Sequence, residues 1–254
     1  VPQNGEIRLD HVSFQYEAGV KALDDVSLTI RPGTVTALVG ESGGGNSTVA
    51  NLIARFWDVS EGSVTVGGVD VRKLDYADLM KHISIVFQDT NLFKMSVAEN
   101  VAMYKPGASR EEIMEVLRQA QCEDILEKLP NGVDSVIGAR GVYLSGGEMQ
   151  RIALARAILK DAPIVLLDEA TAFADAENEY LIQRALDILL HGKTVLMIAH
   201  RLQTIVHADQ IIVMQRGGIA EQGTHEELMQ RQGVYAKMYH EYENSVSWKI
   251  GGWA

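Results

Sequence analysis

A glycine-rich stretch, GESGGGNST at residues 40–48, carries residue types that suit phosphate binding. The pattern G-x-x-x-x-G-K-[ST] describes loops whose backbone N–H groups cradle phosphates. Gly40, Gly45 and Ser47 stand in their places, but Asn46 occupies the lysine position. Asparagine offers a neutral N–H₂ donor on a shorter stem, so the loop loses its positive charge. Taken by itself, the stretch fits either a phosphate-binding loop or a simple glycine turn.

The segments on both sides of the loop favour phosphate binding. The run TVTALVG before it is short, apolar and β-branched, which is typical of a buried strand. The run STVANLIARFW after it has helical spacing, and its predicted apolar face consists of Val49, Leu52, Ile53 and Phe56. Since a helix N-terminus attracts anions, we expect a strand–loop–helix unit that directs its N–H groups at a phosphate.

Two adjacent acids, Asp168 and Glu169, follow the apolar run IVLL. An Asp at the carboxyl end of a buried strand can hold Mg²⁺, and the neighbouring Glu can orient an attacking water. Two acids at such a place can also be no more than a solvated strand end, so this pair alone leaves both interpretations open.

A third piece, LSGGEMQRIALARA, places Ser145 before two glycines and a long helix. Ser145 is suited to cap this helix, whose start would be a second place that attracts anions. By itself the piece could be only a well-capped helix.

Strands and helices alternate through most of the chain, which predicts an α/β fold with a mostly parallel sheet covered on both faces. The alternating run at 6–16 indicates a strand near a sheet edge, and residues 62–71 indicate a hairpin. Continuous helices are predicted for 109–129 and for 224–242. The tail at 243–254 shows no pattern, and we expect it to be disordered or partly vector-derived.

The composition narrows the classes of function. The net charge of -11 opposes a nucleic-acid partner, because phosphate backbones call for basic surfaces. The single cysteine, Cys122, excludes an intrachain disulfide and is expected to be a packed thiol. No stretch approaches the roughly 18 apolar residues of a membrane span. A function at a membrane would therefore require another segment or subunit.

Together these motifs give the chain a strong resemblance to the nucleotide-binding domain of ATP-binding-cassette (ABC) transporters of the exporter type. The resemblance covers about residues 5–242, and its motifs follow the family's order. The loop from Gly40 to Thr48 resembles Walker A, and LSGGE at Leu144–Glu148 resembles the family signature, with Glu148 where Gln is commoner. The resemblance implies a parallel P-loop NTPase-like core, an antiparallel β subdomain and an inserted helical subdomain at about 89–160.

The resemblance also assigns roles to single residues. It implies catalytic roles for Glu169, His200 and Gln88. It implies Mg²⁺ contacts from Ser47, Gln88 and Asp168. The implied ATP contacts are Tyr16, Gly40, Glu41, Ser42, Gly43, Gly44, Gly45, Asn46, Ser47, Thr48, Ser145, Gly146, Gly147 and Asp175. Tyr16 matches the residue that stacks on adenine, and the catalytic candidate His200 matches the residue that contacts the γ-phosphate.

The resemblance implies partners as well. Two such domains pack head to tail, so that Ser145, Gly146 and Gly147 serve the ATP of the opposite subunit. The second domain is an identical or a related chain. ATP closes this dimer, hydrolysis opens it, and a transmembrane domain receives the motion at the cytoplasmic face of a membrane.

Asn46 is the main departure from the family pattern. A charge-assisted hydrogen bond contributes about 1.5–3 kcal/mol, against about 1 kcal/mol for a neutral one, so we expect weaker ATP binding. We expect a larger loss in turnover, on the order of 10²–10³. Because Gln88, Asp168, Glu169 and His200 all remain, a single substitution in an otherwise complete site is favoured over natural decay. The pattern has smaller departures at three other positions. The resemblance places Ala139 in the segment that contacts the membrane domain, and Phe173 and Ala174 just before the D-loop aspartate.

Two other functions remain open. The first is a nucleotide-binding clamp or degenerate site with little hydrolysis, which Asn46 makes credible. The second is a soluble ABC ATPase that acts on nucleic acid. The short, cysteine-poor interval between Gln88 and the signature, together with the acidic charge, opposes the second.

Overall fold

The computed structural model describes residues 1–41, 43–87, 92–138, 142–169 and 176–251. The chain divides into two compact units. The first comprises Val1–Met80, Leu167–Glu169 and Thr194–Ala254, and the second comprises Lys81–Leu166 and Ala170–Lys193. Within the described residues, none of the helices has the length and apolar character that a membrane crossing requires.

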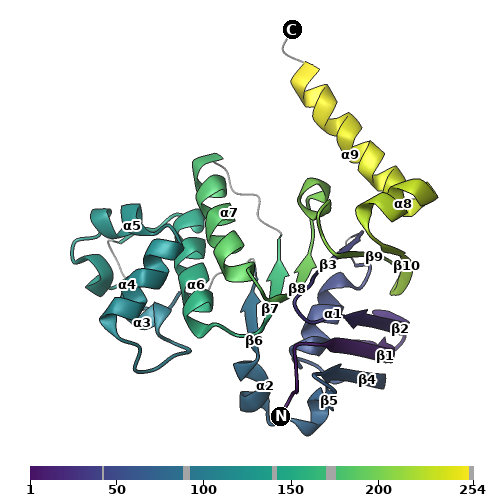
Figure 1. The fold of residues 1–254 in the computed structure, drawn as a ribbon, viewed down its shortest axis with the longest axis horizontal. Helices are drawn as coiled ribbons and strands as arrows, with labels where there is room; N and C mark the ends of the chain where they lie inside the picture. Colours follow the sequence, from purple (N-terminus) through teal and green to yellow (C-terminus); the bar gives the residue numbers. More distant parts are fainter. Residues whose placement is uncertain (42, 88–91, 139–141, 170–175, 252–254) are drawn as a thin grey trace. The chain divides into compact units, whose positions relative to one another are not determined.

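The first unit begins with a four-stranded antiparallel sheet in the order β2-β1-β4-β5 (Figure 1). Its strands are β1 (Ile7–Phe14), β2 (Leu23–Ile30), β4 (Glu61–Val66) and β5 (Val69–Asp70). Apolar residues such as Ile7 and Leu9 alternate with exposed ones and are buried on one face. The strand predicted near a sheet edge is β1, which lies beside the edge strand β2 and pairs with β4 on its other side.

The first unit also holds the parallel strands that position the site. Strands β8 (Thr194–Ile198) and β9 (Gln210–Gln215) flank β3 (Val35–Gly40) in parallel, and β10 (Gly218–Gly223) pairs with β9 in antiparallel fashion. The end of β7 (Ile164–Asp168) lies beside β8, where the Glu169 N–H donates to the Ile198 carbonyl at 2.9 Å. The parallel pairing of β3 with β8 and β9 confirms the predicted parallel core, and the interior of β3 is buried as expected.

The remaining elements of this region are short except for the last. They are α1 (Asn46–Ile53), η1 (Val71–Lys73), α2 (Tyr76–Lys81), η3 (Leu202–Ile205), α8 (His225–Arg231) and α9 (Val234–Gly251). Helix α1 ends before Phe56, which is 46% exposed rather than part of the apolar face. The single closing helix predicted for 224–242 is two helices, separated at Gln232 in a left-handed conformation. Residues 243–251, expected to lack structure, continue α9.

The second unit consists mainly of helices. Strand β6 (Ile83–Val86) and the start of β7 are accompanied by α3 (Val97–Val101), α4 (Arg110–Gln119), α5 (Glu123–Lys128), η2 (Gly132–Asp134), α6 (Gly146–Lys160) and α7 (Ala176–Leu190). The predicted single helix at 109–129 breaks at Gln121, whose φ is 61°. The α/β fold class is confirmed, while the boundaries 1–242, 243–254 and 89–160 stay predictions.

Candidate functional site

The glycine loop connects a buried strand to the helix that follows it, as predicted. Gly40 ends β3, and a Cβ there would lie 2.4 Å from the Met214 carbonyl oxygen, so only glycine fits. Gly45 precedes α1 with φ of 106°, a conformation that glycine adopts readily. None of the described side chains caps α1. The first N–H groups of this helix therefore remain available to an anion.

Asn46 is the first residue of α1 and lies inside the loop. Its Oδ1 atom is buried and has no hydrogen-bond partner among the described residues. Its Nδ2 atom lies 3.5 Å from the position that a Cβ on Gly40 would take. A buried polar atom without a partner is unusual in a folded protein. This amide oxygen can only accept a hydrogen bond, so its partner must be a donor such as water, whereas the Nδ2 group is the donor that Asn46 offers to a phosphate. Glu41, Gly43 and Ser47 are exposed on the same loop, whereas Gly44 is buried.

Tyr16 lies against the same helix. Its hydroxyl is 3.0 Å from the Thr48 hydroxyl and accepts a hydrogen bond from Asn51 Nδ2 at 3.2 Å. Tyr16 as a whole residue is 42% exposed. The structure thus joins Tyr16 to the phosphate-loop helix, although 32 residues separate Tyr16 from Thr48 in the sequence.

The acids after β7 and the histidine after β8 form one polar cluster. Asp168 ends the buried strand as predicted, and its Oδ1 lies 2.9 Å from His200 Nε2. The backbone N–H groups of His200 and Arg201 donate to Glu169 Oε2 at 3.3 and 3.4 Å. The side chain of Asp168 is 19% exposed and that of His200 is 51% exposed. Both groups can therefore face a ligand without leaving the edge of the sheet.

The LSGGE segment starts α6 in the second unit. Ser145 caps the helix as predicted: its Oγ accepts from the Glu148 N–H at 3.2 Å, and Glu148 Oε1 accepts from the Ser145 N–H at 3.1 Å. Burial raises the pKa of Glu148, but hydrogen bonds from Lys128 and Ser145 outweigh burial and lower it overall. Gly146 is exposed, whereas a Cβ on Gly147 would lie 2.9 Å from Asn178 Cγ.

Several predicted residues fall outside the described part of the chain. These are Ser42, Gln88 and Asp175, together with Ala139, Phe173 and Ala174 from the departures noted above. Among the described residues, the first unit holds Tyr16, the glycine loop, Asp168, Glu169 and His200, and the second unit holds Ser145, Gly146 and Gly147.

Sequence reasoning missed three side chains near the loop. Asn51 contacts the Tyr16 hydroxyl, Trp57 packs edge-on against the Tyr16 ring, and Phe14 does the same from β1. The available signal was that Thr48 and Asn51 are three residues apart on a helix and so share a face.

A glycine loop before a helix, with acids and a histidine at the ends of neighbouring parallel strands, defines a nucleotide-binding α/β domain. Residues 23–172 match the family described as "ABC transporter". The chain belongs to this family.

Relatives of known description agree with the family. Over 235 residues, the chain is 53% identical to the mycobactin import ATP-binding/permease protein IrtA of Mycolicibacterium thermoresistibile, covering 92% of this chain and 26% of that protein. It is 48% identical over 235 residues to the ATP-dependent lipid A-core flippase of Legionella pneumophila strain Lens, covering 92% and 40%. A solved bacterial Atm1-family ABC exporter with ATP bound is similar with a TM-score of 0.87 and 38% identity, covering 95% and 42%.

The chain therefore spans about a quarter to two fifths of the length of these relatives. It corresponds to the nucleotide-binding motor domain of an ABC transporter, a domain class that binds and hydrolyses ATP. The roles of single residues are not tested by these similarities and stay predictions.

Proposed function

We propose that the domain binds ATP with Mg²⁺ at the glycine loop and, as part of an exporter-type ABC transporter, hydrolyses it there. The observation that carries this proposal is that three features follow neighbouring strands: the loop after β3, the acids after β7 and His200 after β8. Ligands of α/β sheets bind outside the carboxyl ends of the parallel strands. The three features lie at that edge.

The donor set fits Mg²⁺. Ser47 offers an exposed hydroxyl and Asp168 a carboxylate, both hard oxygen ligands of the kind this ion prefers. When bound, Mg²⁺ would neutralise charge on the phosphate oxygens. Ser47, Asp168 and Gln88 would hold it, and the backbone N–H groups from Glu41 to Thr48 would bind the phosphates.

The remaining residues would act on the other parts of the nucleotide. Glu169 would orient the attacking water, and Gln88 would contact the same water. His200 would contact the γ-phosphate, and Tyr16 would stack on adenine through its exposed ring. Ser145, Gly146, Gly147 and Asp175 would serve the ATP held by a second domain packed head to tail.

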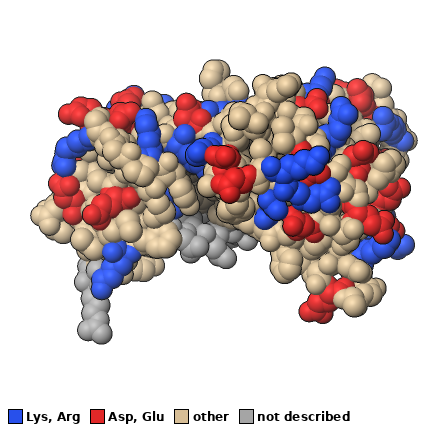
Figure 2. Space-filling view, turned by 90° about the horizontal axis from the view of Figure 1, so that it is seen from below, with Lys and Arg blue, Asp and Glu red and all other residues tan. Residues whose placement is uncertain are grey.

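The partners follow from the relatives' architecture. The mycobactin importer is described as an ATP-binding/permease protein, and this chain matches about a quarter of it. We therefore assign the chain a transmembrane partner and place it at the cytoplasmic face of a membrane. Acidic and basic side chains are interspersed on the face drawn in Figure 2, and the overall charge of -11 does not favour a nucleic-acid partner.

The transported substrate is selected by parts of the transporter outside this domain. The relatives' names refer to mycobactin import and to lipid A-core flipping, although in each the 235 aligned residues are about half identical to this chain. Similar motor domains thus serve different cargoes, and we assign cargo selection to the transmembrane segments.

Asn46 gives rise to a second candidate, a nucleotide-responsive clamp that binds ATP with little hydrolysis. Its neutral side chain cannot supply the positive charge that lysine gives to the β- and γ-phosphates. The backbone cradle and Ser47 remain, so we expect binding to survive better than turnover.

Paired measurements of binding and turnover separate the two candidates. Nucleotide binding is measured by calorimetry and phosphate release by a coupled assay, for this chain and for Glu169→Gln. A motor predicts Mg²⁺-dependent phosphate release that Glu169→Gln abolishes while ATP binding persists. A clamp predicts binding in both proteins with no release above the variant's background. Absence of ATP binding to the native chain would contradict both.

A further inference from the structure

The Tyr16 hydroxyl is held at two points by one helix. Thr48 Oγ1 lies 3.0 Å from it, and Asn51 Nδ2 donates to it at 3.2 Å. Thr48 is 5% exposed and Asn51 is half-buried, so both contacts come from the packed side of α1. A tyrosine hydroxyl on a free ring would rotate in water, whereas two partners three residues apart on a helix fix its position.

The three side chains form a chain of hydrogen bonds. Asn51 donates its N–H to the Tyr16 oxygen, and either hydroxyl of the Tyr16–Thr48 pair can donate to the other. Such chains polarise one another, so each bond strengthens the next.

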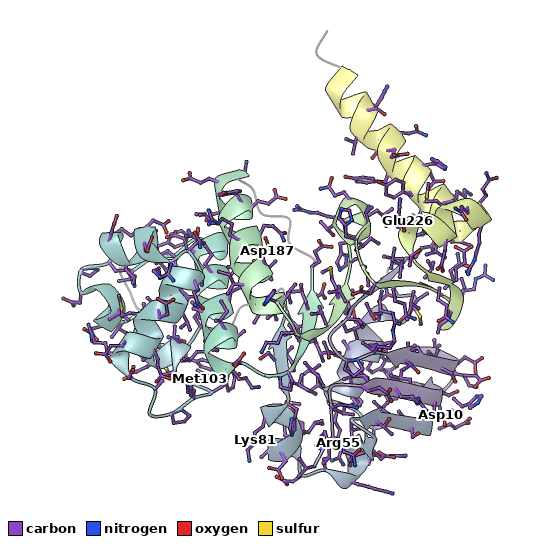
Figure 3. All side chains as sticks on the ribbon, viewed as in Figure 1. Asp10, Arg55, Lys81, Met103, Asp187 and Glu226 are labelled. Atoms are coloured by element: carbon purple, nitrogen blue, oxygen red, sulfur yellow. The ribbon has the colours of Figure 1, made fainter. Side chains whose placement is uncertain are left out.

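Aromatic neighbours fix the ring itself. Phe14 packs edge to face with Tyr16 at 4.8 Å between centroids, and Trp57 does so at 5.4 Å, each at an interplanar angle of 90°. Arg55, labelled in Figure 3, secures the turn that carries Trp57 by donating to the Leu74 carbonyl at 3.1 Å and to Asp58 at 3.0 Å. Despite these contacts, 42% of Tyr16 remains exposed.

We propose that Asn51 is a positioning residue for the nucleotide base: through the Tyr16 hydroxyl it holds the exposed ring in the orientation that stacks on a purine. The assignment rests on the proposed role of Tyr16 in adenine binding. A ring already fixed before the ligand arrives loses little conformational freedom on binding, and this gain in affinity is specific to the base.

The first test compares a ligand with a base and one without. ATP and inorganic tripolyphosphate are titrated into the full chain by calorimetry, for the native protein and for Asn51→Ala. Loss of one neutral hydrogen bond should weaken ATP binding about three- to tenfold and leave tripolyphosphate binding unchanged. The matched control is Asn244→Ala, on the exposed surface of α9, which should change neither. Equal weakening of both ligands would overturn the proposal, since it would show that Asn51 only supports the loop.

The second test is a double-mutant cycle with Tyr16→Phe, which removes the hydroxyl and keeps the ring. Tyr16→Phe should weaken ATP binding as Asn51→Ala does, and the double variant should be no weaker than either single variant. Additive losses would show that Asn51 acts independently of Tyr16 and would overturn the proposal.

Tyr16→Ala distinguishes failure of the inference from failure of the site assignment. If Tyr16→Ala weakens ATP binding and Asn51→Ala does not, the base site stands and the positioning role is wrong. If Tyr16→Ala also leaves ATP binding unchanged, the adenine site itself has been misplaced, and the positioning role is overturned with it. Thermal unfolding of each variant checks that the fold is intact.

Discussion

Nε2 of His200 lies 2.9 Å from Oδ1 of Asp168, so the side chains proposed to contact the γ-phosphate and Mg²⁺ bind each other. The backbone N–H groups after β8 also reach Glu169, which ties the ends of two neighbouring strands together. These contacts fix the side chains at this edge of the sheet before any ligand binds. A ligand that engages Asp168 and His200 must replace their mutual contact.

His200→Ala should lower ATP turnover by about 10²–10³, the size expected for loss of one donor to a developing charge. The variant is made in the Asn46→Lys background, so that the starting rate is high enough to measure. ATP binding should fall much less than turnover, because the glycine loop is intact. Phosphate release and calorimetric binding measure the two effects.

The control for this change is His240→Ala. His240 is exposed on α9, and its Nδ1 lies 3.4 Å from Glu243 Oε2. It is 40 residues after His200 in the sequence and is not one of the proposed site residues. Its loss should leave turnover unchanged. Similar rates for His200→Ala and its background would show that the γ-phosphate contact has been assigned to the wrong residue.

Asn46→Lys should restore the charge that the phosphate loop lacks. We expect tighter ATP binding by up to about 2 kcal/mol and faster phosphate release by about 10²–10³. The reason is that an ammonium group interacts more strongly with phosphate charge, most of all in the transition state. Steady-state release at saturating ATP and calorimetric affinity report the two gains.

Asn244→Lys adds the same charge on the exposed surface of α9 and is the matched control. It should leave both quantities unchanged. Equal rates for the native chain and Asn46→Lys would sink the view that Asn46 limits turnover.

Local sequence patterns predicted much of the site. The β3–loop–α1 unit, the acids at the end of β7 and the Ser145 cap each depend on residues adjacent in sequence. Such features follow from backbone geometry and capping, which short stretches determine. This locality explains why the sequence alone located them.

The sequence patterns did not reveal contacts between distant residues, nor two features of the helices. The Tyr16–Asn51 contact joins residues that are 35 positions apart in the sequence. The break between α4 and α5 occurs because Gln121 takes a left-handed conformation, and no glycine marks it. The helical tail shows that a segment without an apolar pattern can extend a helix begun upstream.

Arg151→Ala should destabilise the fold by about 2–4 kcal/mol, because a buried guanidinium group loses all its hydrogen bonds and its packing. The Arg151 side chain is 1% exposed and donates to Asp124 at 2.7 and 3.1 Å and to Asn178 Oδ1 at 3.0 Å, besides the Gln121 carbonyl. Urea unfolding followed by circular dichroism measures the loss.

Arg118→Ala is the comparison for Arg151. Arg118 pairs with Glu115 at 2.6 Å, but its side chain is 59% exposed. Water screens such pairs, so the change should cost less than about 1 kcal/mol. Equal costs for the two variants would mean that burial of Arg151 is not what makes its network important.

The buried thiol of Cys122 should make the free energy of unfolding decrease at high pH. Burial raises the pKa of its thiol from 9.0 to about 12, because the thiolate would lose its hydration. The unfolded chain then releases the proton first, so the contribution of the protonated thiol is complete below about pH 9 and is lost as pH rises toward 12. We expect the free energy of unfolding to fall more steeply between these values for the native chain than for Cys122→Ala. In the native state at neutral pH the thiol should also react with a disulfide reagent only after denaturant is added. Parallel urea titrations between pH 8 and 11 measure the slope, and identical slopes for both proteins would rule out the thiol as its source.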